Sequence, residues 1–525
     1  MSMSTVDRTV QRGDENHLGW CDLVEGPGEP TIDALDGASE LDATVEPLAV
    51  LVHLTDLHIC DAESPARVEY LDRLADPDSP LRKEVGHVGS YRPQEILTVQ
   101  VADTMVRTVN GIECGPITGA PVDMVLLTGD VTDNAQANEL SWYRVLLDGG
   151  TVAARSGDDA RSSWVGVSDA ATWDERYWHP DGPPDGVAPD RPTEIEGYPR
   201  CPGLIEAARA DFDTPGLSYP WISVHGNHDG LLQGTLPADA RARTYAVGSS
   251  RVVGLAPDAD PLVASSSNAM VGPVEFDIDP AAPTQEVPAD ERRRFVQQGE
   301  HSRVLGMPGT YGVRELGALR LIYLDSVNPH GGWQGSLDAE QFEWLQDRLS
   351  ESTDTYTVIA SHHPSPTMVN DYAPDGAMRR VLGDEVIGEL LEHDQVIAWI
   401  AGHVHFHAAL AHHRPDSDSP HLWEITTSAL IDWPQQGRVV EFLRSGDRVG
   451  IASTVIDHEA PLDWRSALTC GWTPQTMAAL SRVLAANDYQ LRADPDFRAL
   501  RDANPQVRNR VWWLADRLGH NRTLT

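Results

Sequence analysis

The sequence predicts an α/β protein whose parallel strands end at a common cleft. Five apolar runs rich in β-branched residues are bounded by turn residues, a pattern typical of the buried strands of a parallel sheet. Each run is followed at once by a short polar string. In open α/β sheets ligands bind beyond the carboxyl ends of the strands, so we expect the polar strings to converge on one site. The runs are residues 50–54, 122–127, 222–224, 356–360 and 396–400.

The polar strings supply the residue types of a metal site. They are Asp56-Leu57-His58, Gly129-Asp130, Gly226-Asn227-His228-Asp229, His362-His363-Pro364 and Gly402-His403-Val404-His405. Seven of their side chains offer oxygen or nitrogen ligands. Seven ligands are too many for one tetrahedral zinc ion, but they suit two ions that share a bridging carboxylate. The seven are Asp56, His58, Asp130, Asn227, His362, His403 and His405.

Asp130 is the best candidate for the bridging carboxylate, because it follows the tight turn expected at Gly129. Two cations about 3.5–4 Å apart repel each other strongly and need an anion between them. In extended segments residues i and i+2 point the same way, so Asp56 and His58 can converge on the metals, as can the two histidines of the last string. No thiol is among the candidate ligands, which favours manganese, iron, zinc or cobalt.

The order of the five motifs, D-x-H, G-D, G-N-H-D, H-H-P and G-H-x-H, resembles that of the calcineurin-like metallophosphoesterase superfamily. The resemblance covers roughly residues 47–145, 217–230 and 308–445. It implies a four-layer α/β/β/α sandwich of two mixed sheets, here with cap-like insertions and a C-terminal helical extension. It also implies one metal ion on Asp56, His58, Asp130 and His405, and a second on Asp130, Asn227, His362 and His403.

The same resemblance implies catalytic roles for His228 and Asp229. His228 would contact the phosphoryl group and help the leaving oxygen depart, while Asp229 would pair with His228, orient it and raise its pKa. Two metal ions lower the pKa of a bridging water and clamp the phosphoryl oxygens. The predicted function is hydrolysis of a phosphomonoester or phosphodiester by a metal-bridging hydroxide.

The net charge narrows the choice of substrate. Eighty acidic residues against forty basic ones give a formal charge of −40, which repels polyanions and makes long nucleic acid an unlikely partner. With the insertions, this favours a small soluble phosphoester such as a nucleotide. A nuclease of the same superfamily is an alternative, and so is a catalytically silent scaffold. Scaffolds of this fold lose ligands, whereas this chain keeps all seven and His228.

The spacing of the motifs indicates how the chain is divided into an arm, a catalytic domain and a C-terminal extension. We predict an N-terminal arm over residues 1–45, laid over the domain or loose, and a catalytic domain over 46–455. A C-terminal helical extension follows over 456–525, with helices expected through residue 518. The catalytic domain carries insertions at about 59–90, 149–216 and 231–304. These either cap the cleft, which we favour because long loops are costly to order, or elaborate the surface.

Further helices and strands are predicted from the spacing of apolar residues. Helices are expected over 93–109 and 138–147 and near Gln341 to Leu349, and strands over 309–313, 319–325, 423–427 and 437–443. Within the third insertion, alternating residues at 243–247 and 274–278 suggest strands. The Gly-rich loop 326–338, which contains Trp333, could hold a substrate base or sugar, or could be a rigid corner.

Several residues beside the candidate ligands are expected to have structural roles rather than to bind metal. We expect His225, His363 and His407 to contact ligands or to satisfy hydrogen bonds rather than to bind metal. Cys60 is expected to be a small buried thiol. Asp133, with its neighbour Asn134, either orients ligands or closes a turn.

Cysteine usage and hydropathy indicate in which cellular compartment the protein is expected. The five cysteines are widely spaced and odd in number, which fits reduced thiols. The first thirty residues contain no apolar run of signal-peptide length, and no stretch of about 18 apolar residues occurs, so a membrane span is not expected. A cytoplasmic protein is the simplest prediction, and export from a longer precursor stays open.

Overall fold

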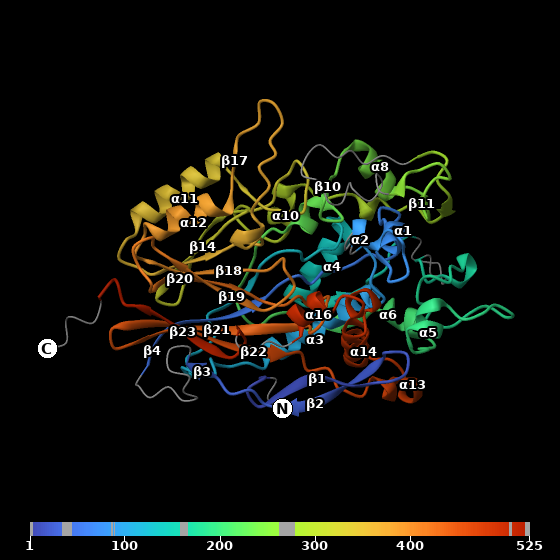
Figure 1. The fold of residues 1–525 in the computed structure, drawn as a ribbon, viewed down its shortest axis with the longest axis horizontal. Coiled ribbons are helices and arrows are strands. Elements are labelled where there is room, and N and C mark those ends of the chain that lie inside the picture. The colour runs from blue at the N-terminus through green and yellow to red at the C-terminus, as the bar shows by residue number, and fades with distance from the viewer. Residues whose placement is uncertain are drawn as a thin grey trace.

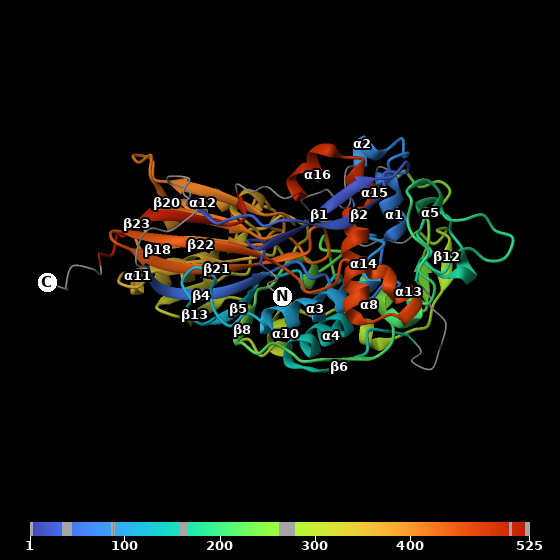
Figure 2. The same ribbon diagram turned by 90° about the horizontal axis from the view of Figure 1, so that it is seen from below.

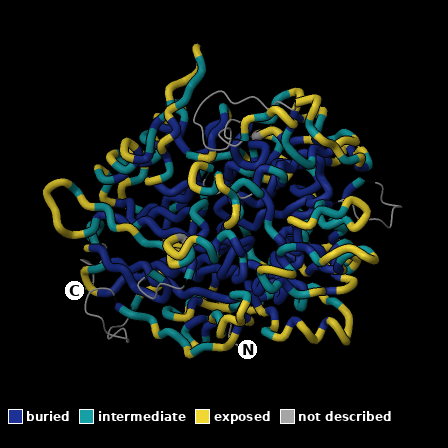
Figure 3. Tube along the Cα trace, turned by 45° about the vertical axis from the view of Figure 1, so that its right-hand side comes forward, coloured by how far each residue is buried: buried dark blue, intermediate teal, exposed yellow. Residues whose placement is uncertain are grey.

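The computed structural model describes residues 4–33, 45–85, 88, 90–157, 166–261, 279–502 and 507–519. Two mixed β-sheets lie at its centre, one of seven strands and one of six. The burial-coloured trace in Figure 3 shows buried residues concentrated in the interior and exposed ones on the outlying loops. Within the described residues no helix is long and apolar enough to cross a membrane.

The seven-stranded sheet contains the first three predicted strands. Its order is β3-β23-β22-β21-β4-β5-β8, and β4, β5 and β8 run parallel to one another. Leu54, Leu127 and Ser223 lie level across these three strands, so the strands end side by side. The bounds are β3 Ile32–Asp33, β4 Glu46–Leu54, β5 Met124–Leu127, β8 Trp221–Ser223, β21 Gln436–Ser445, β22 Arg448–Asp457 and β23 Arg510–Ala515.

The six-stranded sheet contains the other two predicted strands. Its order is β13-β14-β16-β18-β20-β19, with β14, β16, β18 and β20 parallel. Ala360 at the end of β16 is level with Ile400 near the end of β18. The bounds are β13 Gly312–Leu316, β14 Leu319–Tyr323, β16 Thr357–Ala360, β18 Val396–Ala401, β19 Ala408–His413 and β20 Pro420–Thr426.

Three apolar clusters hold these elements together. One cluster joins the facing sides of the two sheets, where Leu51 and Leu126 meet Leu321 and Val358. A second lies between the six-stranded sheet and helices α11 and α12, which Figure 1 shows over that sheet. The third and largest joins the seven-stranded sheet to α3, α4 and α14. The prediction of a mixed α/β fold with two mixed sheets is confirmed.

The helices cover the sheets close to where the apolar periodicity placed them. Residues 93–109 contain the short η2 and then α3, and 138–147 fall within α4, whose first turn is held by a reciprocal cap between Gln136 and Glu139. The bounds are η2 Glu95–Leu97, α3 Thr98–Asn110, α4 Ala137–Asp148, α11 Ala339–Glu351, α12 Gly383–Leu391 and α14 Pro474–Ala486.

The insertions contain short elements, several of which, such as α1, α5, α8 and β11, lie on the right of Figure 1. Apolar side chains of the first and third insertions form one small cluster, in which Ala66 and Leu71 meet Leu232, Ala242 and Phe295. The bounds are α1 Glu69–Asp72, α2 Arg82–Val85, β6 Gly150–Val152, α5 Arg191–Ile195, α6 Leu204–Ala208, β7 Phe212–Thr214, α8 Ala240–Val247, β11 Ser250–Val252, β12 Thr284–Glu286 and α10 Gln298–Val304.

One predicted strand of the third insertion is wrong. Residues 243–247 belong to helix α8, because Asp239 caps its first turn by accepting from the Ala242 N–H at 2.7 Å. Ala242 and Ala246, four residues apart, then share the buried face of the helix. The other predicted strand, 274–278, lies outside the described residues.

The C-terminal extension is only partly helical. Helices α13 Ala467–Cys470, α14, α15 Tyr489–Arg492 and α16 Pro495–Arg501 are present, but Arg510–Ala515 form β23, against the predicted helix. Trp512 and Leu514 face the cluster between the sheets, whereas Val511 and Trp513 face the opposite side. Because both faces are apolar, the strand shows no polar alternation in the sequence.

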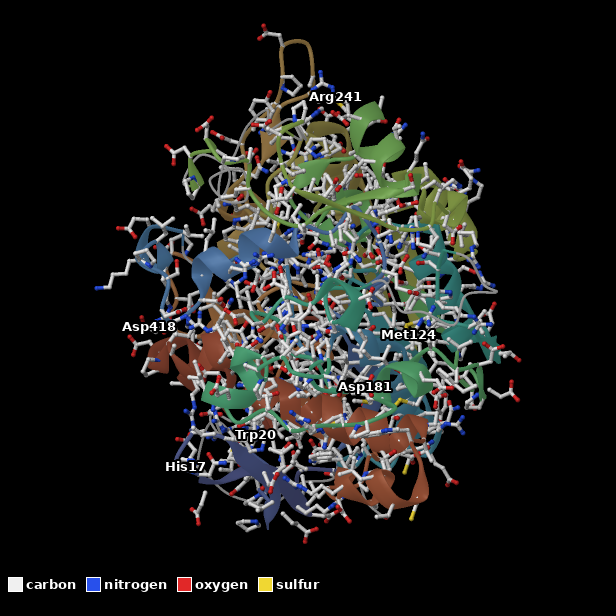
Figure 4. The ribbon with its side chains drawn as sticks, turned by 90° about the vertical axis from the view of Figure 1, so that its right-hand side faces the viewer. His17, Trp20, Met124, Asp181, Arg241 and Asp418 are labelled. Atoms are coloured by element: carbon white, nitrogen blue, oxygen red, sulfur yellow. The ribbon has the colours of Figure 1, made fainter. Side chains whose placement is uncertain are left out.

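The described part of residues 1–45 lies against the domain. Strands β1 Arg8–Glu15 and β2 Cys21–Pro27 form an antiparallel hairpin, seen at the lower edge of Figure 1 and again in the turned view of Figure 2. Trp20, labelled in Figure 4, packs edge-on against Tyr198 of the second insertion at 5.0 Å between ring centroids. The Thr5 N–H donates to the Val455 carbonyl at 2.9 Å.

Candidate metal centre

The carboxyl ends of the two sheets meet at the five predicted strings. Within the seven-stranded sheet the Asp56 N–H donates to the Gly129 carbonyl at 3.1 Å. Contacts between the sheets are equally direct, because the His403 N–H donates to Asp56 Oδ2 at 3.0 Å and His362 Nδ1 donates to the Thr128 carbonyl at 2.7 Å. The backbone therefore fixes how the two halves of the site face each other.

Five of the seven candidate ligands have a left-handed backbone. Positive φ angles occur at Asp56, His58, Asp130, His403 and His405, with values from 46° to 69°. A non-glycine residue in such a region costs on the order of 1–3 kcal/mol, and residues of this kind cluster at functional sites. The chain thus turns sharply after β4, β5 and β18, and these turns direct the polar side chains toward the centre.

Four side chains form the first half of the site. Asp56 Oδ1 lies 3.1 Å from His405 Nε2, and His58 Nε2 lies 3.8 Å from Asp130 Oδ2. The rings of His58 and His405 approach to 5.2 Å between centroids. Asp56, His58 and His405 can each direct a ligand atom to within 4.8 Å of the other two.

The second half shares Asp130. His362 Nε2 lies 3.2 Å from Asp130 Oδ2 and 2.9 Å from Asn227 Oδ1. His403 Nδ1 lies 3.2 Å from the same His362 nitrogen. The structure therefore brings all seven predicted ligands together, with Asp130 between the two halves as a bridging ligand would be.

The donor atoms fit metal ions. Among the described residues His58 Nε2 is buried without a hydrogen-bond partner, and buried Asp56 Oδ1 faces His405 Nε2, which is an acceptor in the neutral ring because His405 Nδ1 donates to Asp432. Both arrangements are costly unless a cation takes that place. His362 Nδ1 already donates to a carbonyl, which leaves Nε2 of the neutral ring as an acceptor, yet this Nε2 faces Asn227 Oδ1 at 2.9 Å and Asp130 Oδ2 at 3.2 Å. Two acceptor atoms in contact are explained by a cation between them.

Carboxylates behind the histidines fix their rings. Asp133 Oδ1 accepts from His58 Nδ1 at 3.1 Å, and Asp133 Oδ2 pairs with Arg67, so this carboxylate orients a candidate ligand rather than only closing a turn. Burial favours a raised pKa for Asp133, but Arg67 and His58 outweigh it and hold the pKa below its ordinary value. Asn134 instead accepts from the Gln233 N–H at 2.7 Å, which joins this turn to the third insertion.

Asp432 has the same role for His405 and was not identified from the sequence. Asp432 Oδ2 accepts from His405 Nδ1 at 2.7 Å and from Arg501 at 2.7 Å, while Oδ1 accepts from Arg92 at 2.8 Å. Against the effect of burial, the two arginines hold the pKa of Asp432 well below its ordinary value. Nothing in the local sequence marks this aspartate, because its partners are distant along the chain.

A hydrogen-bond chain supports Asp56 from inside the sheets. Every donor in it points toward Asp56, and the steps measure 2.6–3.3 Å. In donor order the members are Arg438, Thr427, His53, Thr128, Thr55 and Asp56. Burial and then the Arg438 charge lower the pKa of His53 to about 3, so its ring is neutral and can both accept and donate.

His228 and Asp229 are placed differently from the expected pair. His228 Nδ1 donates to the Asp133 carbonyl at 2.6 Å, and its ring lies 4.5 Å from that of His58. Asp229 instead accepts from the Val131 N–H at 3.0 Å and, with its other oxygen, from the Gly226 N–H at 2.8 Å. Its carboxylate therefore fixes the backbone around the centre, because both of its oxygens are already engaged there and not on the His228 ring.

The neighbouring histidines have structural partners. His363 donates to the Trp333 carbonyl at 3.0 Å and also contacts Ser326, although its ligand atom lies near those of His362 and His403. His407 contacts Arg438 at 2.8 Å, and His225 Nδ1 lies 3.5 Å from Asp325.

The Cys60 thiol is buried, as expected, and burial raises its pKa well above the ordinary value.

The calcineurin-like phosphoesterase family model matches residues 203–407. This span includes the last three motifs, with Asn227, His362, His403 and His405. Residues 203–407 therefore match this family, and for this part of the chain the resemblance drawn from the motif order is confirmed.

Two curated relatives match shorter parts of the chain. A probable cyclic nucleotide phosphodiesterase of Rhodococcus erythropolis is 30% identical over 142 residues, which cover 26% of this chain and 44% of the relative. A cAMP/cGMP dual specificity phosphodiesterase of Mycobacterium tuberculosis is 34% identical over 88 residues, which cover 17% and 26%. The chain therefore spans less than half the length of the curated relatives it matches.

Solved structures also align with the chain. A dimetal phosphatase from Danio rerio aligns over 79% of this chain and 100% of its own, at 12% identity and a TM-score of 0.30. GAP50, the anchor in the inner membrane complex of Plasmodium, aligns over 78% of this chain and 84% of its own, at 9% identity and a TM-score of 0.28.

Proposed function

We propose that the protein is a metal-dependent phosphoric ester hydrolase that acts on a small soluble phosphomonoester or phosphodiester. The observation that carries this proposal is the convergence of seven side chains, from five strand ends of two sheets, on one centre in which His58 Nε2 and Asp56 Oδ1 are buried without a hydrogen bond in the described structure. The names of the relatives, cyclic nucleotide phosphodiesterases, support a nucleotide as the organic part of the substrate. The charge of −40 favours small anions over nucleic-acid polymers.

The two halves of the site would each hold one metal ion. Asp56, His58 and His405 would bind one, Asn227, His362 and His403 would bind the other, and Asp130 would bind both. The imidazole, amide and carboxylate donors suit manganese, iron, zinc or cobalt. When bound, two such ions supply a hydroxide nucleophile at neutral pH and neutralise charge on the phosphoryl group.

His228 is the residue placed to act on the substrate. Its Nδ1 is engaged by the Asp133 carbonyl, so Nε2 is the nitrogen left to face a bound phosphoryl group. A protonated Nε2 would donate to an equatorial oxygen or to the leaving oxygen. Asp229 holds the turn from Gly226, which keeps His228 beside the centre.

The domain limits form part of the proposal. Residues 46–455 would be the catalytic unit, and the insertions at about 59–90, 149–216 and 231–304 would narrow access to it. The cluster shared by the first and third insertions supports a common cap, because each insertion buries apolar side chains of the other.

A substrate panel on metal-reconstituted full-length protein tests the function. We expect metal-dependent hydrolysis of small mono- or diesters, lost in Asp130→Asn and retained in Glu441→Gln. Glu441 is a buried carboxylate that accepts from Ile117 and Thr118 and contacts no candidate ligand in the described structure. A silent scaffold would show no hydrolysis with any metal, and a nuclease would prefer polymers to small esters.

A further inference from the structure

An exposed tryptophan stands beside the metal centre. Trp333 is 40% exposed, although it belongs to the loop next to the buried His363. Its ring lies nearly parallel to that of His403, with 23° between the planes and 5.7 Å between the centroids. Because this exposed ring lies beside a candidate ligand, its free face is placed to contact a molecule bound at the centre.

The loop around Trp333 is held rigidly. The Gly332 N–H donates to the Thr235 carbonyl at 2.8 Å, and Asn370 Nδ2 donates to the Gly331 carbonyl at 2.8 Å. Gly331 and Gly332 have φ of +103° and +88°, and a Cβ on Gly332 would lie 2.7 Å from Asn370 Nδ2. The exposure of Trp333 is therefore built into the backbone, and little entropy would be lost when a ligand meets it.

A second exposed apolar residue extends this edge. The Asn370 N–H donates to the Gly335 carbonyl at 3.1 Å, and the Gly335 N–H donates to the Thr367 carbonyl at 3.0 Å, so the two loops run side by side. Val369, between these contacts, is 54% exposed. Metal ions and His228 would hold the phosphate, whereas the Trp333 ring offers flat apolar surface for the organic group.

We propose that Trp333 stacks on a flat aromatic ring, such as a nucleobase, in the organic group of the phosphoester bound at the metal centre. This inference rests on the proposed function and makes it narrower. Tryptophan is suited to the role because its large π-face accepts any base, and stacking of one base on an aromatic side chain is worth about tenfold or more in affinity. Trp333 is then a specificity-determining residue that does not touch the reacting atoms.

The test compares two phosphates that differ only in the base. Adenosine 5′-monophosphate and ribose 5-phosphate are titrated into metal-reconstituted full-length protein, with KM replacing Kd if either is hydrolysed. We expect the wild type to bind the nucleotide about tenfold more tightly than ribose 5-phosphate. Trp333→Ala should abolish this preference, and Trp333→Phe should keep most of it. Met378→Ala is the control, because Met378 is also exposed, at 51%, but lies outside the loop that carries Trp333.

The metal content of each variant is measured in parallel, since loss of Trp333 could disturb His403. Equal affinity of the wild type for both phosphates would overturn the inference, and so would a preference that survives Trp333→Ala. An equal loss of both affinities together with loss of metal would assign Trp333 to support of His403 alone, which also overturns it. A preference that depends on Trp333 in a protein that hydrolyses nothing would keep the inference and refute the proposed function.

Discussion

Replacing Asp432 by asparagine should weaken metal binding without removing a candidate ligand. The two carboxylate oxygens of Asp432 accept from His405, Arg501 and Arg92 at 2.7–2.8 Å. Asparagine keeps one acceptor oxygen, but its NH₂ group can accept from none of these donors. Whichever way the amide turns, either the His405 ring or an arginine loses its partner.

The contacts of Asp432 determine how much metal affinity and folding stability the substitution should cost. Loss of a partner that orients a metal-binding histidine typically costs 10- to 100-fold in metal affinity, which corresponds to about 1.4–2.8 kcal/mol. The variant also leaves two guanidinium groups in the protein interior beside a neutral amide. Breaking such a buried ion pair costs roughly 3 kcal/mol of folding stability, at the lower end of the usual range because one acceptor remains.

Two measurements separate these effects. Competition with a chromophoric chelator gives the metal affinity, and urea unfolding of metal-free protein gives the stability. Glu441→Gln is the matched control, because it neutralises another buried carboxylate away from the candidate ligands. Metal affinity within twofold of the wild type in a folded Asp432→Asn variant would refute the role given to Asp432. An equal loss of affinity in Glu441→Gln would show that the effect is general destabilisation.

Three further predictions follow from the same structure. Asp130→Asn should lose at least one metal ion and most turnover while circular dichroism stays unchanged; two bound ions and near-normal activity would contradict the bridge. His228→Ala should keep both metals and lower kcat about 10²- to 10⁴-fold, most for poor leaving groups, and metal loss would be the contrary result. His458 accepts from Arg482 at 3.0 Å, and burial, then the Arg482 charge, holds its pKa well below 6.5. Below pH 6.5 the unfolded chain therefore binds a proton that the folded chain does not, so stability falls as pH drops. In urea unfolding from pH 6.5 to 5, His458→Gln should lose less stability than the wild type, by up to about 1.4 kcal/mol per pH unit; parallel pH profiles would contradict this.

The strands and the convergence of the candidate ligands were predictable because their signals are local. A buried parallel strand is a continuous apolar run, and the ligands follow within a few residues of its end, as at Asp56 after β4 and His362 after β16. The sequence could not place the strands in two separate sheets. That division depends on which apolar faces meet, and the cluster between the sheets joins residues as far apart as Leu51 and Trp512.

The residues behind the ligands were missed because they are brought together only by the fold. Asp432 lies 27 positions after His405, and its partner Arg92 is 340 positions from it. The helix predicted over residues 511–518 was wrong for a related reason. A strand buried on both faces has no alternation to distinguish it from a buried helix, and its pairing with β22 decides the outcome.

The segments added to the two sheets contribute charge to the metal centre. Arg67 of the first insertion pairs with Asp133 behind His58, and Arg501 of the C-terminal extension pairs with Asp432 behind His405. Arg438, on the strand that pairs with β4, begins the hydrogen-bond chain to Asp56. A centre rich in carboxylates within a chain of charge −40 requires nearby cations to keep those carboxylates ionised and in place. Arg67 and Arg501 supply two of these cations from separate segments, so the first insertion and the C-terminal extension help to hold the candidate ligands in position whether or not the insertions also cover the cleft.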